Sequence, residues 1–399
     1  MNNESIVELT AAHQMANYAR FPVAFVRGEG ARLIDANGKE YLDFLGGIAV
    51  ALLGHAHPGV TQAISAQAAL LVHVSNLFHV QVQSEVARLL SQATTGGKVF
   101  FCNSGTEANE AAIKLARKWS FDQGKVDAFE IVAVDGSFHG RTYGSLSATG
   151  QPKFHEGFAP MVPGFRAVPF GDLDALEAAL TDRTCAFLVE PIQGEIGVRM
   201  HPAGYYERAA QLCAERGILL IADEIQTGMG RTGEMLASTK FGVTPDIVTL
   251  AKGIANGLPL GAVVARDEVA ASFGPGSHGS TFGGNPVCCA AAKVVLETVT
   301  APGFLTEVLR KGDRLSDGLR AIAGRRSDIV QVRGMGLMLA FEMTVETKPI
   351  AKRCLDDGLI INATAGTVIR LLPPLTVTDA EIDRALAMLE AALPGEGRR

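Results

Sequence analysis

The sequence predicts an α/β protein with a large domain, built on a mainly parallel sheet between helices, and a smaller α+β domain. Between about residues 59 and 295, short apolar runs alternate with longer helical stretches, which is typical of a parallel sheet covered on both faces. After about residue 296 a long helical region comes first and several strands follow it. With 399 residues, the chain is long enough to form two such domains.

Composition and charge narrow the class of protein. The formal net charge is −6, whereas a nucleic acid or an anionic membrane would bind a basic face, so we expect neither as a partner. The amino terminus lacks the pattern of a signal peptide, and no apolar run reaches the length of a membrane span. The six cysteines show no CxxC spacing. We therefore expect a cytoplasmic protein with reduced, mostly buried cysteines.

Residues 1–55 predict a polar arm and then a small antiparallel sheet that packs with the C-terminal domain. Short β-like runs follow the arm at residues 23–26, 32–35 and 41–44. His55 and His57 have a spacing that metal ligands can have, but no further ligand cluster accompanies them. A structural turn is therefore the favoured interpretation, and no metal is expected.

The rest of the chain divides into a domain at 56–295 and a domain at 296–399. Buried strands of the first are expected at residues 99–101, 131–134, 186–189, 219–222, 247–250 and 261–264. Strands of the second are expected at residues 329–333, 336–341, 358–361 and 367–370. The last helix begins with a capping box, Thr378 to Glu381, and has an apolar stripe at Ile382, Leu386, Leu389 and Leu393.

Two of the expected buried strands end on charged residues, Asp223 and Lys252. Because ligands of open α/β sheets bind at the carboxyl ends of strands, the acid and the amine are expected to face one pocket. An amine that forms an imine with a carbonyl cofactor, opposite a carboxylate that keeps a ring nitrogen protonated, is the minimum equipment of a pyridoxal phosphate enzyme. The alternative is that Asp223 caps a turn and Lys252 is a solvated loop residue.

The segment from Ser104 to Glu107 predicts a helix amino terminus that could hold a phosphate. It follows the strand at 99–101, and Ser104 and Glu107 have the spacing of a capping box. Gly105 would let a ligand approach the free backbone N–H groups of the first turn. The alternative is an ordinary well-capped helix.

Aromatic and charged residues also follow the ends of other expected strands, as Asp223 and Lys252 do. Phe138 and Arg141 follow the strand at 131–134, where an aromatic ring can stack on a heteroaromatic ring and an arginine can bind a carboxylate through two donors. Either could equally be surface packing. Arg370 stands in an otherwise apolar strand, where a guanidinium is costly unless it is paired or faces a ligand, and Glu195 is its candidate partner.

A glycine motif offers a rival interpretation. Residues 228–233 match GxGxxG after a strand, and Asp246 lies close to the position of a ribose-binding acid in a nicotinamide dehydrogenase. However, residues 223–227 separate these glycines from the tip of the strand, and the helix expected next is weak. A dinucleotide site is therefore the less favoured alternative.

Taken together, six blocks resemble the class III aminotransferases of fold type I. They are SGTEAN at 104–109, FHGR at 138–141, EPIQGE at 190–195, DEIQTGMGRTG at 223–233, AKG at 251–253 and GSTFGGNP at 279–286. Their order and spacing match over essentially the whole chain. The resemblance implies a seven-stranded sheet in the large domain, pyridoxal 5'-phosphate as cofactor, and a homodimer with shared active sites.

The resemblance also assigns roles to residues. Lys252 resembles the lysine that binds the cofactor and moves the substrate proton, and Asp223 the acid that keeps the pyridine nitrogen protonated. The other cofactor-binding residues that it implies are Gly105, Thr106, Phe138, Glu224, Ile225, Gln226 and, from the partner subunit, Thr281.

For the substrates, Arg141 is similar to the arginine that binds the α-carboxylate of an acylated ornithine, and Arg370 to the one that binds glutamate or 2-oxoglutarate. Glu195 resembles a switch that covers Arg370 when the ω-amino donor is bound, and Ser280 a residue that reaches the partner's active site. Ile196, after Glu195, departs from the small residue usual in the family, and it could narrow the pocket or stiffen the switch.

The resemblance implies transfer of the terminal amino group of N-acetylornithine to 2-oxoglutarate. Succinylornithine, ornithine and succinyldiaminopimelate are alternative donors. An aminomutase or a decarboxylase is less favoured, because the two arginines provide two separate carboxylate-binding sites. A non-catalytic dimeric binding protein is the alternative from another class, and it is weakened because no candidate catalytic position is missing.

Overall fold

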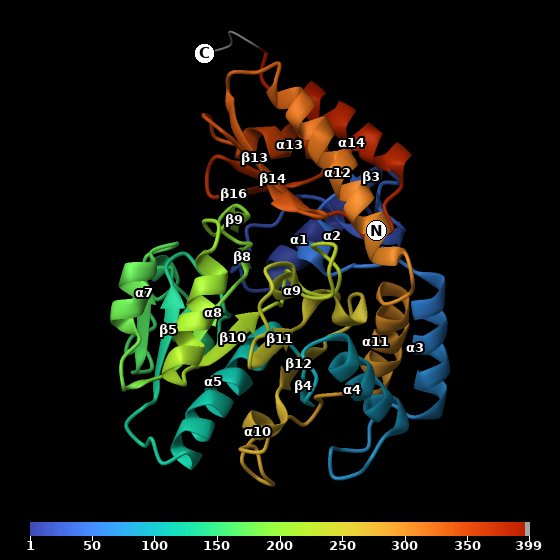
Figure 1. Ribbon diagram of the computed structural model, residues 1–399. Helices are drawn as coiled ribbons and strands as arrows, with labels where there is room; N and C mark the ends of the chain where they lie inside the picture. The colour runs from blue at the N-terminus through green and yellow to red at the C-terminus, as the bar shows by residue number, and fades with distance from the viewer. Residues whose placement is uncertain (396–399) are drawn as a thin grey trace.

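The computed structural model describes residues 1–395, and its largest element is a seven-stranded sheet in the lower half of Figure 1. In order across the sheet its strands are β4 (Lys98–Cys102), β12 (Gly261–Ala265), β11 (Ile247–Leu250), β10 (Leu219–Asp223), β7 (Thr184–Val189), β5 (Glu130–Val134) and β6 (Phe165–Val168). Neighbours from β11 to β6 pair in parallel, whereas β12 runs antiparallel to both β11 and β4. The predicted mainly parallel sheet is confirmed.

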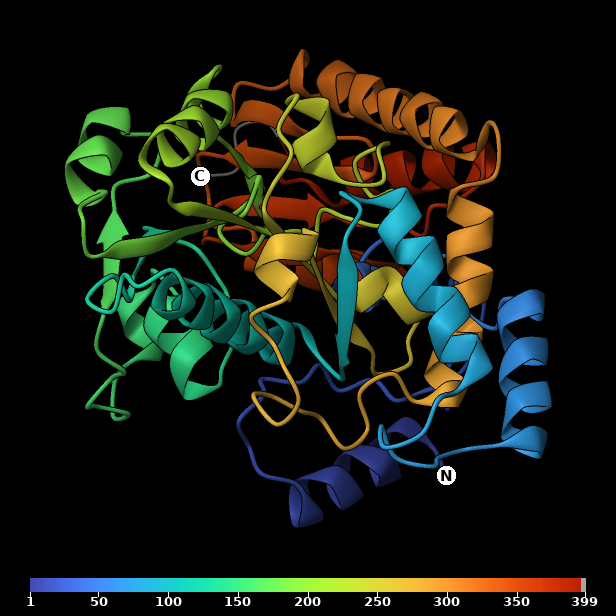
Figure 2. The same ribbon diagram turned by 60° about the horizontal axis from the view of Figure 1, so that its bottom comes forward.

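Helices cover both faces of this sheet, as Figure 2 shows for α5 on one side and α7 and α8 on the other. The strands are buried on both faces because successive side chains enter different cores: Leu219 and Ile221 pack with α5, and Leu220 packs with α8. The helices here are α3 (Pro58–Leu70), α4 (Gln81–Ala93), α5 (Gly105–Asp122), α6 (Tyr143–Ala148), α7 (Leu173–Ala179), α8 (Tyr205–Arg216), α9 (Ala237–Lys240), α10 (Asp267–Ala270), α11 (Pro286–Val299) and the 3₁₀ helices at Pro152–Phe154 and Lys252–Ala255.

The C-terminal part forms the upper half of Figure 1. Its four-stranded antiparallel sheet has the order β13 (Ile329–Met335), β14 (Met338–Met343), β17 (Val368–Leu371) and β16 (Asn362–Thr364). It packs with α12 (Phe304–Ala323), α13 (Lys348–Asp356) and α14 (Asp379–Ala392). The capping box at Thr378 and Glu381 is confirmed.

The N-terminal segment pairs with this part through one strand. Its antiparallel strands β1 (Phe25–Glu29), β2 (Arg32–Asp35) and β3 (Glu40–Asp43) are extended by β15 (Leu359–Ile360), which pairs parallel to β3. The expected polar arm forms a helix, α1 (Asn3–His13), which buries none of its residues. The short α2 (Gly46–Ala49) follows β3. The domain boundaries stay a prediction, and the one near residue 295 falls inside α11.

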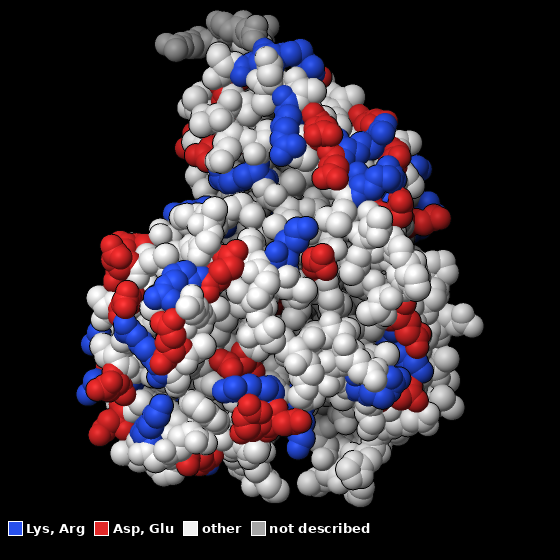
Figure 3. Space-filling model, in the orientation of Figure 1, with Lys and Arg blue, Asp and Glu red and all other residues white. Residues whose placement is uncertain are grey.

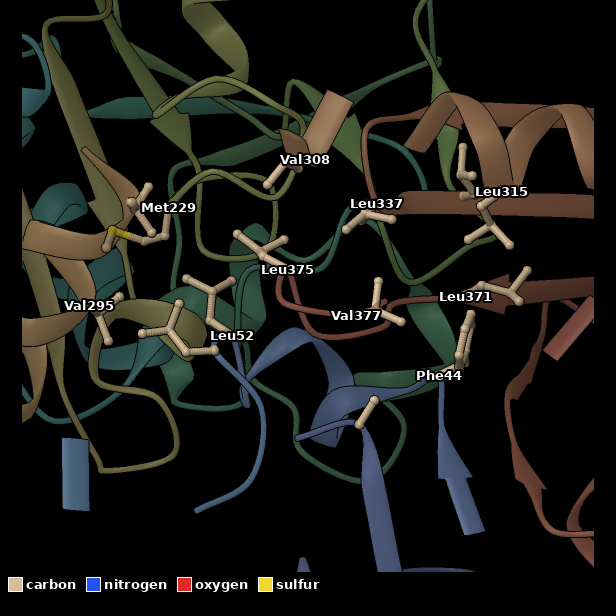
Figure 4. Packing of buried hydrophobic residues seen from close by; sticks show 14 of the residues in the cluster. Phe44, Leu52, Met229, Val295, Val308, Leu315, Leu337, Leu371, Leu375 and Val377 are labelled. Atoms are coloured by element: carbon tan, nitrogen blue, oxygen red, sulfur yellow. The ribbon is translucent and has the colours of Figure 1, made fainter. Parts of the chain in front are cut away.

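One continuous apolar core joins the two halves. Figure 4 shows Leu52 and Phe44 from the N-terminal segment, Met229 and Val295 from the large sheet's half, and Leu337, Leu371 and Leu375 from the C-terminal part packed together. Buried packing of this kind holds both halves in one arrangement, which fixes the geometry of a site between them.

The cysteines, the surface charge and the apolar helices can be compared with the expectations from composition. All six cysteines are buried and free. On the face in Figure 3, acidic and basic side chains are interspersed. Within residues 1–395 no single helix is long and apolar enough to cross a membrane, and only α11 with α12, bent by 75°, passes that test as a pair by length and composition.

Candidate active site

The cavity at the carboxyl ends of β4, β5, β7, β10 and β11 has a volume of about 420 Å³. It lies where ligands of parallel sheets bind, and its size suits a small organic ligand. Of the residues predicted from the sequence, those that line it are Gly105, Thr106, Phe138, Arg141, Glu195, Asp223, Ile225, Gln226 and Lys252.

Asp223 ends β10 and is 3% exposed. One of its oxygens, Oδ2, accepts hydrogen bonds from Asn109 Nδ2 at 2.8 Å and contacts His139 Nδ1 at 2.7 Å. The backbone N–H of Ile225 donates to Oδ1 at 3.1 Å. The carboxylate is thus fixed in orientation by three partners, as an acid that must hold a proton on a ligand atom needs to be.

Lys252 follows β11 and begins a short 3₁₀ helix with a φ of 46°, in the left-handed region. Burial lowers the pKa of its amine below the ordinary value, and the carboxylates of Glu195 and Asp223 oppose this shift. A lowered pKa provides a larger fraction of neutral amine, which is the form that attacks a carbonyl carbon or accepts a proton.

The amino terminus of α5 opens onto the same cavity. Ser104 caps the helix through the N–H of Glu107, but the Glu107 carboxylate accepts from the N–H and side chain of Asn103. The predicted capping box is therefore only half formed. A Cβ on Gly105 would come within 2.9 Å of the Ile225 side chain, so a larger residue would displace Ile225 or the first turn of α5. The free N–H groups and the helix dipole make this end a site for an anion.

Arg370 is 1% exposed and is covered by Glu195. Its Nη1 donates to Glu195 Oε1 and to the Gly194 carbonyl, both at 2.9 Å, and to Gln226 Oε1 at 3.2 Å. Asn362 Oδ1 accepts from Nη2 at 2.8 Å. Burial would raise the pKa of Glu195, but the charges of Arg370 and Lys252 outweigh it and lower that pKa below the ordinary value. The contact between Arg370 and Glu195 is therefore an ion pair with auxiliary hydrogen bonds.

Arg141, by contrast, is exposed at the cavity and has no acidic partner within residues 1–395. Its guanidinium carbon lies 3.8 Å from the ring centroid of Phe154 and 5.4 Å from that of Phe138. Stacking on aromatic rings orients the guanidinium while leaving its donors available for a carboxylate.

Comparison with known proteins identifies the family. A family model described as aminotransferase class-III matches residues 13–393. The chain belongs to the class-III aminotransferases. It is 49% identical to an acetylornithine aminotransferase of Aquifex aeolicus, over 95% of this chain and 99% of that protein. It is 47% identical to one of Caldanaerobacter subterraneus subsp. tengcongensis, over 95% and 96%.

Solved structures agree with this aminotransferase fold. The ornithine aminotransferase of Toxoplasma gondii ME49 has a TM-score of 0.95 and 36% identity, covering 98% of this chain and 95% of that one. The acetylornithine aminotransferase of Elizabethkingia anophelis has a TM-score of 0.88 and 33% identity, covering 98% and 99%. The predicted family and fold are therefore confirmed.

Class-III aminotransferases use pyridoxal phosphate, and the residues of this cavity fit that cofactor. An amine of lowered pKa, an oriented carboxylate, a helix amino terminus freed by a glycine, and the side chains of Phe138 and Ile225 all face one space. The glycine motif at 228–233 leads only to the short α9, which is no dinucleotide-binding helix.

Besides Arg370, which Glu195 covers, four residues that the sequence linked to the active site do not line this cavity. Glu224 was expected among the cofactor-binding residues, but its buried carboxylate accepts from Thr227, Ala237 and Ser238 on the far side of the turn. The Glu224 side chain does not line the cavity, and its contact with the cofactor stays a prediction. Ile196 packs against Gly136: a Cβ built on Gly136 would lie 2.4 Å from Cδ1 of Ile196. Ile196 therefore does not narrow the cavity around Lys252.

Ser280 and Thr281 are the other two. Ser280 accepts from Asn103 Nδ2 at 3.1 Å, and Thr281 is exposed beside a separate, smaller hollow. Neither lines the cavity of its own chain.

The sequence assigned no role to Asn109, His139 or Glu190, which act on the site through other residues. Asn109 and His139 orient Asp223, and Glu190 accepts from the N–H groups of Phe138 at 2.8 Å and Gly194 at 3.1 Å. Burial raises the pKa of Glu190 to about 7. One signal was present: Asn109 is a polar residue in the alanine-rich, buried face of α5.

Proposed function

We propose that this aminotransferase moves the terminal amino group of N2-acetyl-L-ornithine to 2-oxoglutarate. The products are N-acetylglutamate 5-semialdehyde and L-glutamate, as in a step of arginine biosynthesis. The observation that carries the proposal is the pair of unlike arginines, with Arg370 buried under Glu195 and Arg141 open at the cavity. The names of the relatives support the choice of amino donor.

The two arginines would serve the two half-reactions in turn. While Glu195 covers Arg370, the cavity offers Arg141 for the α-carboxylate of acetylornithine, whose side-chain amine then reaches Lys252. A dicarboxylate brings a second negative charge that competes with Glu195 for Arg370. Glu195 and Arg370 form a single ion pair. When a substrate carboxylate replaces Glu195 beside Arg370, the charge of the site changes while its residues stay in place.

The chemical step would depend on Lys252 and Asp223. Pyridoxal phosphate, when bound, supplies an electron sink for the carbon that carries the amino group. Lys252 Nζ would hold the cofactor covalently and then take the proton from that carbon, which its lowered pKa allows near neutral pH. Asp223, oriented by Asn109 and His139, would keep the proton on the pyridine nitrogen.

The remaining cofactor contacts follow from the walls of the cavity. Gly105 and Thr106, in the first turn of α5, would hold the phosphate. Phe138 and Ile225 would pack on the two faces of the ring, and Gln226 would donate to its phenolic oxygen.

We further propose a homodimer in which Ser280 and Thr281 reach the partner's cavity. Both lie on an exposed segment outside their own cavity, tied to the α3–α4 connection because Asn76 Nδ2 donates to the Ser280 carbonyl at 3.0 Å. That surface is apolar, with large exposed side chains at Leu70, Leu77, Phe78 and Phe282. Contiguous exposed apolar side chains mark interaction surfaces.

The proposed substrate is tested by single half-reactions. Holoenzyme is mixed with acetylornithine, succinylornithine, ornithine, succinyldiaminopimelate or 4-aminobutyrate, and conversion of the cofactor to its amine form is followed by absorbance. We expect the highest rate constant per substrate concentration with acetylornithine. A higher value with free ornithine would make this an ornithine aminotransferase, and no conversion by any donor would favour a non-catalytic binding protein.

A further inference from the structure

A second cavity, of about 350 Å³, lies between the β8–β9 hairpin and the edge of the C-terminal sheet. The hairpin strands are β8 (Ile192–Gln193) and β9 (Arg199–Met200), and Figure 1 shows them beside β16 and β13. No described residue lines both this cavity and the one around Lys252. The second cavity is therefore a separate space.

Arg199 supplies a positive charge that is not neutralised inside this cavity. Its guanidinium carbon lies 3.9 Å from the ring centroid of Phe170, which is within the range of a cation–π contact. Across residues 1–395, the Arg199 side chain has neither a hydrogen bond nor an ion pair. Its donors are thus positioned by stacking and remain available for an acceptor.

Arg333 adds a second guanidinium to the same wall. Its Nε donates to the carbonyls of Gly197 at 2.9 Å and Val198 at 3.2 Å, and its Nη1 donates to the Glu342 carboxylate. The cavity wall therefore holds two guanidinium groups and one carboxylate, which pairs with Arg333 and leaves Arg199 without an acidic partner among residues 1–395. Burial, and then the charge of Arg333, lower the pKa of Arg199, as expected where positive charge is in excess.

The remaining wall combines polar side chains, Gln331 and Thr367, with apolar ones. Ile196, Met200 and Val368 line it together with the ring of Phe170. A carboxylate is a planar acceptor that matches the two-pronged donor of arginine, and a short hydrocarbon chain would pack against these side chains. We propose that this cavity binds a small organic anion, a carboxylate with a short apolar chain, through Arg199.

The test uses holoenzyme and sodium butyrate as the probe. Thermal unfolding is followed at increasing butyrate, with sodium chloride added to keep ionic strength constant, and the shift in Tm gives an apparent dissociation constant. The variants are Arg199→Gln and a matched control, Arg208→Gln, because Arg208 is an exposed arginine in a surface ion pair with Glu215. Arg141→Gln is included because butyrate can also meet Arg141 in the active-site cavity.

We expect saturable stabilisation of the wild type, Arg208→Gln and Arg141→Gln, and an apparent dissociation constant at least about tenfold higher for Arg199→Gln. Should Arg199→Gln fold poorly, Arg199→Lys replaces it, since lysine keeps the charge but lacks the stacked, two-pronged donor. Equal binding by the Arg199 variant and the wild type, or no saturable stabilisation of the wild type, would overturn the proposal. Inorganic phosphate that bound as tightly as butyrate would also overturn it, because the apolar side chains of the wall would then contribute nothing.

This binding measurement involves no turnover, so its outcome is independent of the proposed function.

Discussion

At the scale of single residues, the site separates binding from chemistry. Arg141 faces the cavity from its edge, whereas Asp223 is held at the end of β10 by buried partners. We therefore propose that Arg141 contributes to substrate affinity and Asp223 to the transition state.

Replacement of Arg141 and replacement of Asp223 should change different kinetic constants. Arg141→Ala is expected to raise the KM for acetylornithine by about tenfold or more, because a charge-assisted contact to its carboxylate is lost. Asp223→Asn should mainly lower kcat, because the amide cannot keep the pyridine nitrogen protonated. Steady-state kinetics measure both, and equal effects on KM would remove Arg141 from its proposed role.

The lowered pKa of Lys252 predicts a pH dependence for cofactor uptake. The neutral amine is the reactive form, so the rate at which apoprotein binds pyridoxal phosphate should rise with pH and level off once the amine is deprotonated. Because burial lowers that pKa, the inflection is expected below the ordinary value of 10.5. Stopped-flow absorbance between about pH 6 and about pH 11, a range that includes the ordinary value, gives the profile. A rate that only begins to rise near 10.5 would contradict the shift.

The sequence predicted the residues whose chemistry stands at a strand end. Asp223, Lys252, Phe138 and Arg141 could be predicted because an apolar run stops immediately or a few residues before each. His139 and Glu190 could not, because they act through hydrogen bonds to residues far away in the chain. Such pairing depends on the tertiary structure, which no local pattern encodes.

At the scale of elements, buried strands were predicted better than the edge of the sheet. β10 and β11 match their apolar runs closely. β6 was missed, because it is an edge strand whose middle residues, Arg166 and Ala167, are exposed. The antiparallel direction of β12 could not be predicted either, since an apolar run does not encode which way a strand points.

The amino terminus of α5 provides a test of one element. Gly105→Ala is expected to raise the dissociation constant of the cofactor by about tenfold, because the new Cβ would meet Ile225 at 2.9 Å and displace it or the first turn. Equilibrium titration of apoprotein with pyridoxal phosphate measures this.

The matched control is Gly274→Ala, since nothing lies within 4 Å of a Cβ there and its φ is not in the left-handed region. This control should bind the cofactor as the wild type does. The same affinity in both alanine variants would mean that the approach of Gly105 to Ile225 is not needed for binding.

At the scale of the whole molecule, the contact between Glu195 and Arg370 depends on both halves of the chain. Arg370 comes from β17 of the C-terminal sheet, and Glu195 precedes β9. Arg231 strengthens this junction from within, because its buried Nη1 donates to the carbonyls of Leu337 and Pro373. A shift between the two halves would therefore separate Glu195 from Arg370.

Disruption of the proposed dimer surface should abolish activity without unfolding the subunit. Phe282→Asp places a charge on an exposed apolar side chain next to Thr281, and we expect monomers in sedimentation velocity with transaminase activity lowered at least about a hundredfold, since a charge buried at an interface costs several kcal/mol. Circular dichroism would confirm that the fold persists. A fully active monomer would show that Ser280 and Thr281 are not needed from a partner.

The most direct test of the account is the absorption spectrum and turnover of Lys252→Ala beside the wild type. We expect the purified wild type to carry the visible absorption of the lysine-bound cofactor and to lose it on addition of acetylornithine. The variant should lack both that absorption and measurable turnover while it keeps the unfolding temperature of the wild-type apoprotein to within a few degrees. Substantial transaminase activity in Lys252→Ala would contradict the assignment of this cavity as the catalytic site.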